Sequence, residues 1–290
     1  MSPPVIAGFS EIRERYDAAF VDLWGTVHNG VRPYPGVLDC LARMRDGGLR
    51  VLLLTNAARL HSAVARQLEG LGVPADCADG IVTAGDVTVQ ALNEAEDAWH
   101  ARLGTRFYHL GNERSASALE EVEGESVALA DADYVLLTGL VDDSTETVED
   151  YGELLARIRA RALPMVCANP DRVVVRGERT IFCAGALADA YEALGGEVRR
   201  HGKPFESIFR RALARLDGIA GERTVMIGDS FSTDIAGAVG VGIDSLWLAG
   251  GIHAAEVGYS EGVPLDPVRL AGVLDRAPAL PTLIAPRLGW

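Results

Sequence analysis

Short apolar runs alternate with longer amphipathic segments along most of the 290-residue chain. Apolar runs bounded by polar residues or glycine predict buried strands, and apolar residues repeated at spacings of three and four predict helices. Strands and helices in alternation are typical of a parallel sheet with helices on its faces. We therefore predict an α/β protein with a doubly wound parallel sheet.

The predicted elements form three series along the chain. The first has strands at 18–23, 50–54 and 81–83, and helices at 36–46, 60–71 and 86–101. The second has strands at 107–110, 134–138 and 164–168, helices at 115–122, 147–161 and 186–194, and a hairpin at 171–182. The third has helices at 205–216 and near 234–239, strands at 224–227 and 245–248, and a proline-rich tail at 278–290. We expect the tail to pack as an irregular arm or a last short strand.

Length and composition narrow the class of protein. A single core stops growing at about 250–300 residues, so 290 residues indicate two domains or one elaborated domain. The net charge of −14 opposes general binding to nucleic acid or anionic lipid. Because no apolar stretch reaches the length of a membrane span and no basic leader precedes an apolar run, we expect a cytoplasmic protein. The four cysteines have no metal-ligand spacing, so we expect them to be reduced and mostly buried.

Two segments place polar side chains at the ends of predicted strands. Asp22 ends the first strand and is followed by a glycine turn, and Thr55 and Asn56 end the second strand. In open α/β sheets, ligands bind at this edge. Each segment also has a simpler interpretation, since an isolated aspartate or threonine there often caps a helix or a turn.

Two more segments lie in the last third of the chain. Lys203, the only lysine, stands between Gly202 and Pro204, and a proline there also suits a plain helix entry. Asp229 follows a strand and Asp234 lies in the next helical turn. Acidic residues at such a position also stabilise a helix by interacting with the positive end of its dipole. A lone lysine among 27 basic residues indicates a position that needs a compact ammonium rather than a planar guanidinium.

Together, the four segments resemble the four motifs of haloacid dehalogenase-like (HAD) phosphohydrolases in their order and in their spacing from strand ends. The insertion between the second and third motifs, with Cys167–Asp171 and the helix start at Gly185–Leu187, resembles class IIA. That class includes NagD-like, 4-nitrophenylphosphatase-like and pyridoxal phosphate phosphatase-like enzymes. The resemblance implies a HAD core at 1–103 and 200–290 with an inserted α/β cap domain at 104–199.

The resemblance also implies a role for each matching residue. Asp22 matches the nucleophile that forms an aspartyl-phosphate. The Thr55 hydroxyl and the Asn56 N–H match the groups that hold the phosphoryl group, and Lys203 matches the lysine that neutralises both nucleophile and phosphate. The implied cofactor is Mg²⁺, which prefers oxygen ligands; its ligands would be Asp22, Asp229, Asp234 and the backbone carbonyl of Trp24.

The first motif departs from the family pattern. Most HAD phosphatases have a second aspartate, used as general acid and base, where this chain has Trp24. An indole can donate a weak hydrogen bond, but it has no group that gains and loses a proton near pH 7. Three explanations stay open: substrates with good leaving groups such as acyl or aryl phosphates, a surrogate acid, or binding with little turnover. His28 is the candidate surrogate, although a histidine in a loop is more often merely exposed.

The cap domain is expected to select the substrate. Asn169, Asp171 and Arg172 are candidate substrate-binding residues, and Arg176 and Arg179 follow them. Arginines suit a second anionic group on the substrate; the competing interpretation is a solvated hairpin face. We predict a Mg²⁺-dependent phosphohydrolase of a small phosphorylated metabolite, or alternatively a phosphometabolite-binding or regulatory protein with little turnover. A homodimer through the cap is a further option, and a dehydrogenase is disfavoured because no G-x-G-x-x-G follows the first strand.

Overall fold

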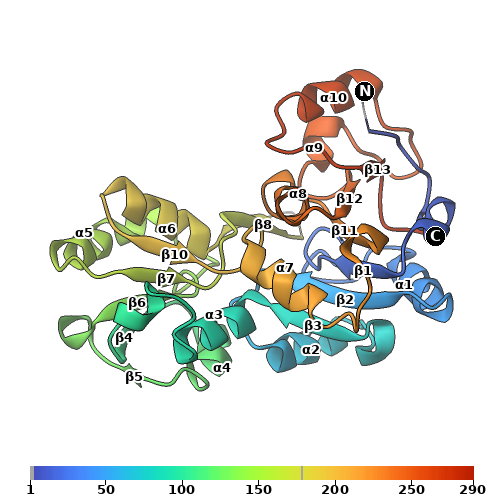
Figure 1. Cartoon of the computed structure of the whole chain (residues 1–290). Coiled ribbons are helices and arrows are strands. Elements are labelled where there is room, and N and C mark those ends of the chain that lie inside the picture. Colours follow the sequence, from blue (N-terminus) through green and yellow to red (C-terminus); the bar gives the residue numbers. More distant parts are fainter. Residues whose placement is uncertain (1–2, 178) are drawn as a thin grey trace.

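Two parallel sheets form the framework of the molecule (Figure 1). The computed structural model describes residues 3–177 and 179–290. The larger sheet has the strand order β13-β12-β11-β1-β2-β3, with every neighbouring pair parallel. Its strands are β1 (Ala18–Val21), β2 (Arg50–Thr55), β3 (Gly80–Thr83), β11 (Thr224–Gly228), β12 (Asp244–Leu248) and β13 (Leu283–Ala285).

Helices cover both faces of this sheet because its central strands are buried on both sides. In β1, Ala19 and Val21 belong to the apolar cluster that includes α1, whereas Ala18 and Phe20 belong to the cluster that includes α7. The helices packed around the sheet are α1 (Val37–Asp46), α2 (His61–Gly70), α3 (Ala84–Asn93), α7 (Glu206–Leu213), α8 (Ala236–Val241), α9 (Ala254–Val257) and α10 (Pro267–Leu274). The predicted doubly wound α/β fold is confirmed.

The second sheet is built from the middle of the chain and lies in the left half of Figure 1. Its order is β10-β7-β6-β4-β5, again parallel throughout. The strands are β4 (Arg106–Leu110), β5 (Glu125–Ser126), β6 (Tyr134–Leu137), β7 (Met165–Cys167) and β10 (Val198–Arg200), and the helices are α4 (Ala116–Leu119), α5 (Gly152–Ala160) and α6 (Ala184–Ala193). Strands β8 (Val173–Arg176) and β9 (Arg179–Phe182) form the predicted hairpin. The boundaries at 104 and 200 remain predictions; Arg200, predicted to begin the second part of the core, is the last residue of β10.

Short helical turns connect these elements. The 3-10 helices are Phe9–Glu11, Arg13–Arg15, Ala75–Cys77, His100–Arg102, Glu113–Ser115, Leu129–Asp131, Val148–Tyr151 and Gly221–Arg223, and a π-helical turn covers Phe231–Ile235. Among the described helices, none is long and apolar enough to cross a membrane. All four cysteines are buried, as predicted.

Some elements differ from the sequence-based prediction. The helix expected at 86–101 ends at Asn93, because Ala95 adopts a left-handed backbone with φ of 49°. Strand β10 was not predicted, since Val198 is its only apolar residue. Helix α10 was also missed, although the Asp266 carboxylate caps it by accepting from the N–H groups of Val268 and Arg269. The tail does contain a last short strand, β13.

Candidate functional site

The candidate site lies at the carboxyl edge of the larger sheet. Asp22 directly follows β1, Thr55 ends β2 and Asp229 directly follows β11. Because these three strands are adjacent and parallel, their carboxyl ends bring the side chains to one place. The Asp22 N–H extends the pairing of β1 with β11 by donating to the Ile227 carbonyl at 2.9 Å. This bond fixes the point from which the Asp22 carboxylate projects.

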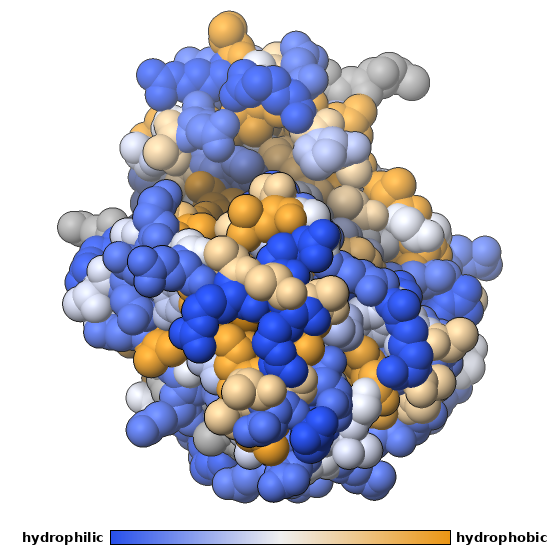
Figure 2. All heavy atoms as spheres, turned by 90° about the vertical axis from the view of Figure 1, so that its left-hand side faces the viewer, coloured by the Kyte–Doolittle hydropathy of each residue, from blue (hydrophilic) through white to orange (hydrophobic). Residues whose placement is uncertain are grey.

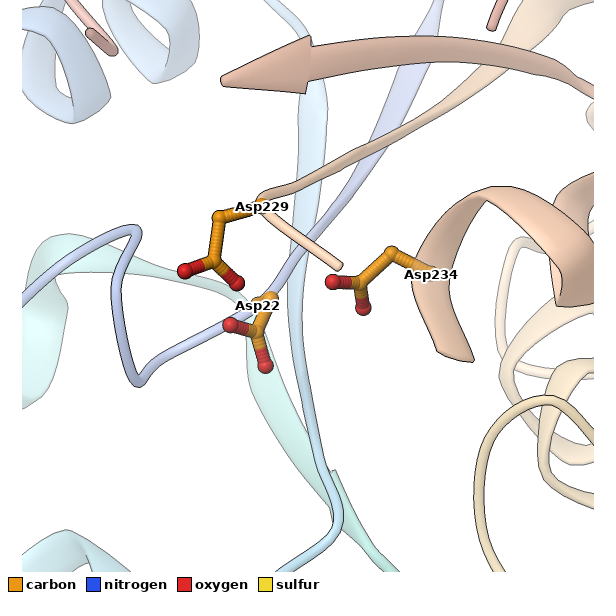
Figure 3. A group of neighbouring side chains, drawn as sticks. All are labelled: Asp22, Asp229 and Asp234. Carbon is orange, nitrogen blue, oxygen red and sulfur yellow. The ribbon is translucent and has the colours of Figure 1, made fainter. Parts of the chain in front are cut away.

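Three carboxylates converge at this edge (Figure 3). Asp22, Asp229 and Asp234 are buried, and one oxygen of each lies within 4.8 Å of the others. The second oxygen (Oδ2) of Asp229 accepts a hydrogen bond from the Ile252 N–H at 2.7 Å, and that of Asp234 accepts from the Ser230 N–H at 3.1 Å. Backbone donors therefore orient two of the three acids.

Glycines leave the space that these acids occupy. A Cβ atom on Gly25 would lie 1.8 Å from Asp229 Oδ2, and one on Gly251 would lie 2.1 Å from the Asp229 Cβ. A Cβ on Gly228 would lie 2.2 Å from the carboxyl carbon of Asp234. Any larger residue at these positions would displace a carboxylate, so close backbone approach is part of the site.

The Lys203 ammonium lies among the carboxylates. Its Nζ is 2.6 Å from Asp22 Oδ1 and 2.6 Å from Asp234 Oδ1, and the residue is 2% exposed. The Asn56 side chain holds the backbone of Lys203, since its Oδ1 accepts from the Lys203 N–H at 2.6 Å and its Nδ2 donates to the Lys203 carbonyl at 3.0 Å. The same Nδ2 donates to Asp171 Oδ1 at 2.8 Å. The Asn56 side chain thus positions the lysine and does not line the cavity.

The electrostatics of the cluster favour a further cation. Burial, opposed in part by Lys203 and reinforced by Asp234, raises the pKa of Asp22 to about 7. Burial and the neighbouring Asp22 raise the pKa of Asp229 well above its usual range. Burial by itself lowers the pKa of Lys203, but Asp22 and Asp234 together raise it. Three acids therefore share one ammonium, and an oxygen-ligand set with this excess of negative charge fits Mg²⁺.

A cavity of about 700 Å³ opens over this cluster. Asp22, Thr55, Asp229 and Asp234 line it from the strand ends of the larger sheet and the turn after β11, and Lys203 lines it from the loop between β10 and α7. The middle of the chain contributes residues that include Asn112, Thr138, Asp143, Asn169, Asp171 and Arg176. This volume is in the range of small-molecule sites and exceeds what a phosphate alone needs. The cavity can therefore hold an organic group as well as a phosphoryl group.

The structure separates the predicted cap-side residues. Asn169 and Asp171 line the cavity, but Arg172 does not. The exposed Arg172 side chain pairs with Asp189 at 2.5 Å outside the cavity wall, so the structure does not bring it together with Asn169 and Asp171. Arg172 and Arg176 are four residues apart and would share a face of a regular strand. Arg172, however, precedes the first residue of β8, so the alternation of side chains does not extend to it. Arg176, within β8, does line the cavity.

Trp24 lines the cavity, and His28 packs behind it. The Trp24 ring centroid is 5.9 Å from the Arg176 guanidinium carbon and 5.0 Å from the His28 ring centroid. His28 is 1% exposed, its Nδ1 accepts from the Gly30 N–H at 3.0 Å, and it does not line the cavity. Burial, with a contribution from Arg59, lowers its pKa to about 4. A neutral histidine in this position has no proton to donate at Nδ1, and its role as a surrogate acid stays a prediction.

Sequence analysis missed one cationic residue of the cavity. Arg287 follows β13, lines the cavity and donates from Nη1 to the Gly25 carbonyl at 3.2 Å. No local motif surrounds it. Its position just after a strand was the one feature of the sequence that could have indicated it. The carboxyl end of β13 lies at the same edge of the sheet as that of β1.

Comparison with known families gives two matches along the chain. A model of the haloacid dehalogenase-like hydrolases matches residues 19–125, and a HAD-hydrolase-like model matches residues 200–275. Both matched ranges contain strands of the larger sheet. The first includes Asp22 and Thr55, and the second includes Lys203, Asp229 and Asp234.

Several characterised proteins are similar over most of the chain. D-glycerol 3-phosphate phosphatase of Mycobacterium tuberculosis is 30% identical over 87% of this chain and 68% of its own length. A haloacid dehalogenase-like hydrolase from Brucella suis is 38% identical, with a TM-score of 0.84 and coverage of 98% of this chain and 100% of that one. The magnesium complex of the Mycobacterium tuberculosis glycerol phosphate phosphatase Rv1692 is 28% identical, with a TM-score of 0.66 over 94% and 75% of the two chains.

A more distant structure shares the class IIA architecture. NagD from E. coli has a TM-score of 0.66 over 94% of this chain and 96% of that one. At 22% identity the likeness concerns the fold alone. It confirms the predicted arrangement of a parallel core sheet with a separate parallel cap sheet.

Proposed function

Since the chain belongs to the haloacid dehalogenase-like hydrolases, we propose that it is a Mg²⁺-dependent phosphatase of a small phosphorylated metabolite, with Asp22 as nucleophile. The observation that carries the proposal is the buried cluster of Asp22, Asp229, Asp234 and Lys203 at the floor of the cavity. The magnesium-bound structure of a similar phosphatase supports the choice of metal.

Each residue of the cluster has a chemical task in this proposal. The Asp22 carboxylate attacks phosphorus, the bond from phosphorus to the leaving oxygen breaks, and water then hydrolyses the aspartyl-phosphate. Lys203, already 2.6 Å from the nucleophile, moderates the charge of the nucleophile and of the phosphoryl oxygens. The Thr55 hydroxyl faces the cavity and donates to a phosphoryl oxygen.

Mg²⁺, held by Asp22, Asp229, Asp234 and the Trp24 carbonyl, would neutralise developing charge as a Lewis acid. Trp24 itself limits the proposed activity. Its indole N–H is too weakly acidic to transfer a proton to a leaving oxygen, and the family uses an aspartate at this point. We therefore propose that the protein acts best on phosphates with a stable leaving group, such as aryl or acyl phosphates. The alternative, binding with little turnover, rests on the same residue. A burst of one phosphate per chain without continued release would favour that alternative.

Metal titration by calorimetry provides the first test. Asp229→Asn and Asp234→Asn each remove one charged ligand and should weaken Mg²⁺ binding by at least tenfold. Asp76→Asn, an exposed acid outside the site, serves as the matched control and should leave the affinity unchanged. Equal affinity in all four proteins would remove the metal assignment. Circular dichroism confirms that the folds are comparable.

Turnover gives the second arm of this test. With Mg²⁺ the protein should release phosphate from phenyl phosphate, and Asp22→Asn should abolish this release. Absence of turnover on aryl and acyl phosphates, in a protein that does bind Mg²⁺, would favour the binding-only alternative.

The predicted dimer through the cap stays a prediction. Figure 2 views the molecule from the side of the second sheet, where hydrophobic residues are interspersed among hydrophilic ones. Nothing on this face identifies a partner.

A further inference from the structure

Arg287 enters the cavity from the end of the chain. It lies two residues beyond β13, at the sheet edge that also carries Asp22 and Asp229. Its Nη1 donates to the Gly25 carbonyl at 3.2 Å. The backbone of Gly25 in turn lies against Asp229, since a Cβ on Gly25 would be 1.8 Å from Asp229 Oδ2. One glycine residue therefore separates the guanidinium from the carboxylate cluster.

The surroundings of Arg287 hold its guanidinium in a defined plane. The guanidinium carbon is 3.9 Å from the Tyr34 ring centroid and 5.0 Å from the Tyr259 ring centroid. Gly250 leaves room for it, because a Cβ there would be 2.8 Å from Arg287 Nε. Aromatic rings on a guanidinium restrict its orientation without using its N–H donors. The group is thus oriented before any ligand arrives.

Arg287 differs from the other arginines of the cavity in its partners. Arg176 pairs with Asp143 at 3.2 Å, and Arg59 donates to Gln67 at 2.5 Å. Arg287 has no carboxylate partner within the described part of the chain, and the Gly25 carbonyl is the hydrogen-bond acceptor found there. A guanidinium has five N–H donors. Arg287 therefore retains donors for a ligand in the cavity.

The charge of the cavity favours one kind of anion at this position. The wall carries five acids, Asp22, Asp143, Asp171, Asp229 and Asp234, against Lys203, Arg59, Arg176 and Arg287. Even with one divalent cation, a bound phosphoryl dianion leaves the cavity with a net negative charge, so a second dianion would be repelled more strongly than a monoanion. A carboxylate carries a single charge and matches the planar fork of a guanidinium.

We propose that Arg287 binds a carboxylate on the organic part of the substrate, so that the substrate is a phosphomonoester of a phenol acid. The inference rests on the proposed phosphatase site, because it places the phosphoryl group at Asp22. It adds to that site a specificity-determining residue and a chemical class of substrate.

The test compares two ligands that differ in one charge. 4-Carboxyphenyl phosphate and 4-carbamoylphenyl phosphate have nearly the same shape, but only the first carries the second anion. Binding is measured by calorimetry with Mg²⁺ in Asp22→Asn protein, where turnover cannot interfere. We expect the carboxylate ligand to bind about tenfold more tightly, as a charge-assisted bond provides. Adding Arg287→Gln should bring the ratio of the two Kd values close to one, and adding Arg287→Lys should retain part of it.

The control variant is Arg172→Gln, which removes an exposed arginine that lies near the cavity but outside its wall. It should leave the ratio unchanged. Equal Kd values for the two ligands in the parent protein would overturn the proposal. So would an Arg287→Gln variant that weakens both ligands equally, because that result follows from loss of the bond to Gly25 alone.

Failure of the proposed function has a different signature. If the native Asp22 protein turned over neither ligand but the Kd ratio behaved as expected, Arg287 would stand as an anion-binding residue and the phosphatase assignment would fall.

Discussion

Lys203 shows why one lysine stands in a chain whose other 26 basic residues are arginines. Its ammonium contacts Asp22 and Asp234 at 2.6 Å each while 2% exposed. A planar guanidinium is wider and could not take the same position between the two carboxylates without moving one of them. The bonds from Asn56 to both backbone groups of Lys203 fix this position further. The position between the two carboxylates therefore requires a side chain that is compact as well as positively charged.

Trp24→Asp is the most direct test of the proposed leaving-group preference. In our proposal the new carboxyl stands at the position of the family's acid, so turnover of an alkyl phosphate should rise by up to about 10²–10⁴-fold. Formation of the aspartyl-phosphate from an acyl phosphate should change little, because a departing carboxylate needs no proton. Burst and steady-state phosphate release separate the two steps.

Trp24→Asn is the matched control for that experiment, because it removes the same ring and supplies no acid. Both variants lose the same contacts of the Trp24 ring with His28 and Arg176, so this loss does not distinguish them. If the two variants gain equally on alkyl phosphates, proton donation is not what Trp24 withholds.

His28 predicts a pH-dependent stability. Burial lowers its pKa from the usual 6.5 to about 4, so the folded protein favours the neutral ring. Between pH 6.5 and about pH 4, His28 is protonated in the unfolded chain but neutral in the folded protein. The free energy of unfolding therefore falls as the pH drops from about 6.5 towards 4. The full effect is roughly 3 kcal/mol.

His28→Asn keeps an acceptor for the Gly30 N–H but removes the titrating group. Urea unfolding at pH 7.5 and at pH 5 should show a smaller loss for the variant than for the native protein, whatever its stability at pH 7.5. An identical loss in both proteins would show that His28 is protonated in the fold and that its burial does not affect its pKa.

At the scale of elements, the loop after β1 holds its shape through glycine and backbone bonds. The Gly25 N–H donates to the His28 carbonyl at 3.0 Å, and the Gly25 carbonyl accepts from Arg287. With φ of +80°, Gly25 occupies a region that other residues rarely adopt. The loop can therefore approach Asp229 closely.

Gly25→Ala should damage the site rather than the fold. Its methyl group would meet Asp229 Oδ2 at 1.8 Å, so the carboxylate must move and Mg²⁺ affinity should fall at least tenfold. Gly48→Ala isolates the backbone strain, because Gly48 has φ of +86° and no atom within 4 Å of an added Cβ. This control should lose about 1–2 kcal/mol of stability and keep its Mg²⁺ affinity. Calorimetry and urea unfolding measure the two quantities; equal Mg²⁺ affinities would remove the close approach of Gly25 as a feature of the site.

At the scale of the whole molecule, the two connections between the sheets touch each other. His100 lies on the outgoing connection and His201 on the returning one, and their Nε2 atoms are 3.0 Å apart. The Asp97 carboxylate lies 2.8 Å from His100 Nδ1, within hydrogen-bond distance, and forms an ion pair with Arg199 at 3.6 Å. Both histidines are buried. This contact joins the two connections between the sheets, and His201 precedes Lys203 by two residues.

His201→Phe should loosen this junction, because it fills the space but leaves His100 Nε2 buried without a partner, at a cost of about 1–3 kcal/mol. Amide hydrogen exchange should become faster at 97–103 and 199–203, while β1 and β11 exchange at native rates. His61→Phe, at a histidine whose side chain is 58% exposed, is the control and should change neither region. Faster exchange across all strands would instead indicate general destabilisation.

The fold class and the convergence of the four segments follow from local patterns along the chain. Alternating apolar runs report burial on both faces of parallel strands, and residues just after such strands must meet at one edge. Asp22, Lys203, Asp229 and Asp234 could therefore be predicted to come together from local patterns. The single lysine and the tryptophan at position 24 were equally visible without coordinates, because each depends on residue type alone.

The directions of side chains outside those motifs depend on contacts between segments that are distant in the sequence. Arg172 and Arg176 are four residues apart, yet one pairs with Asp189 outside the cavity and the other lines it. Arg287 reaches the site because β13 lies at the far edge of the sheet with its carboxyl end beside that of β12, an order that no local pattern encodes. Strand-end positions follow from periodicity along the chain, whereas the direction of a side chain in a hairpin or a tail is set by packing against residues distant in sequence.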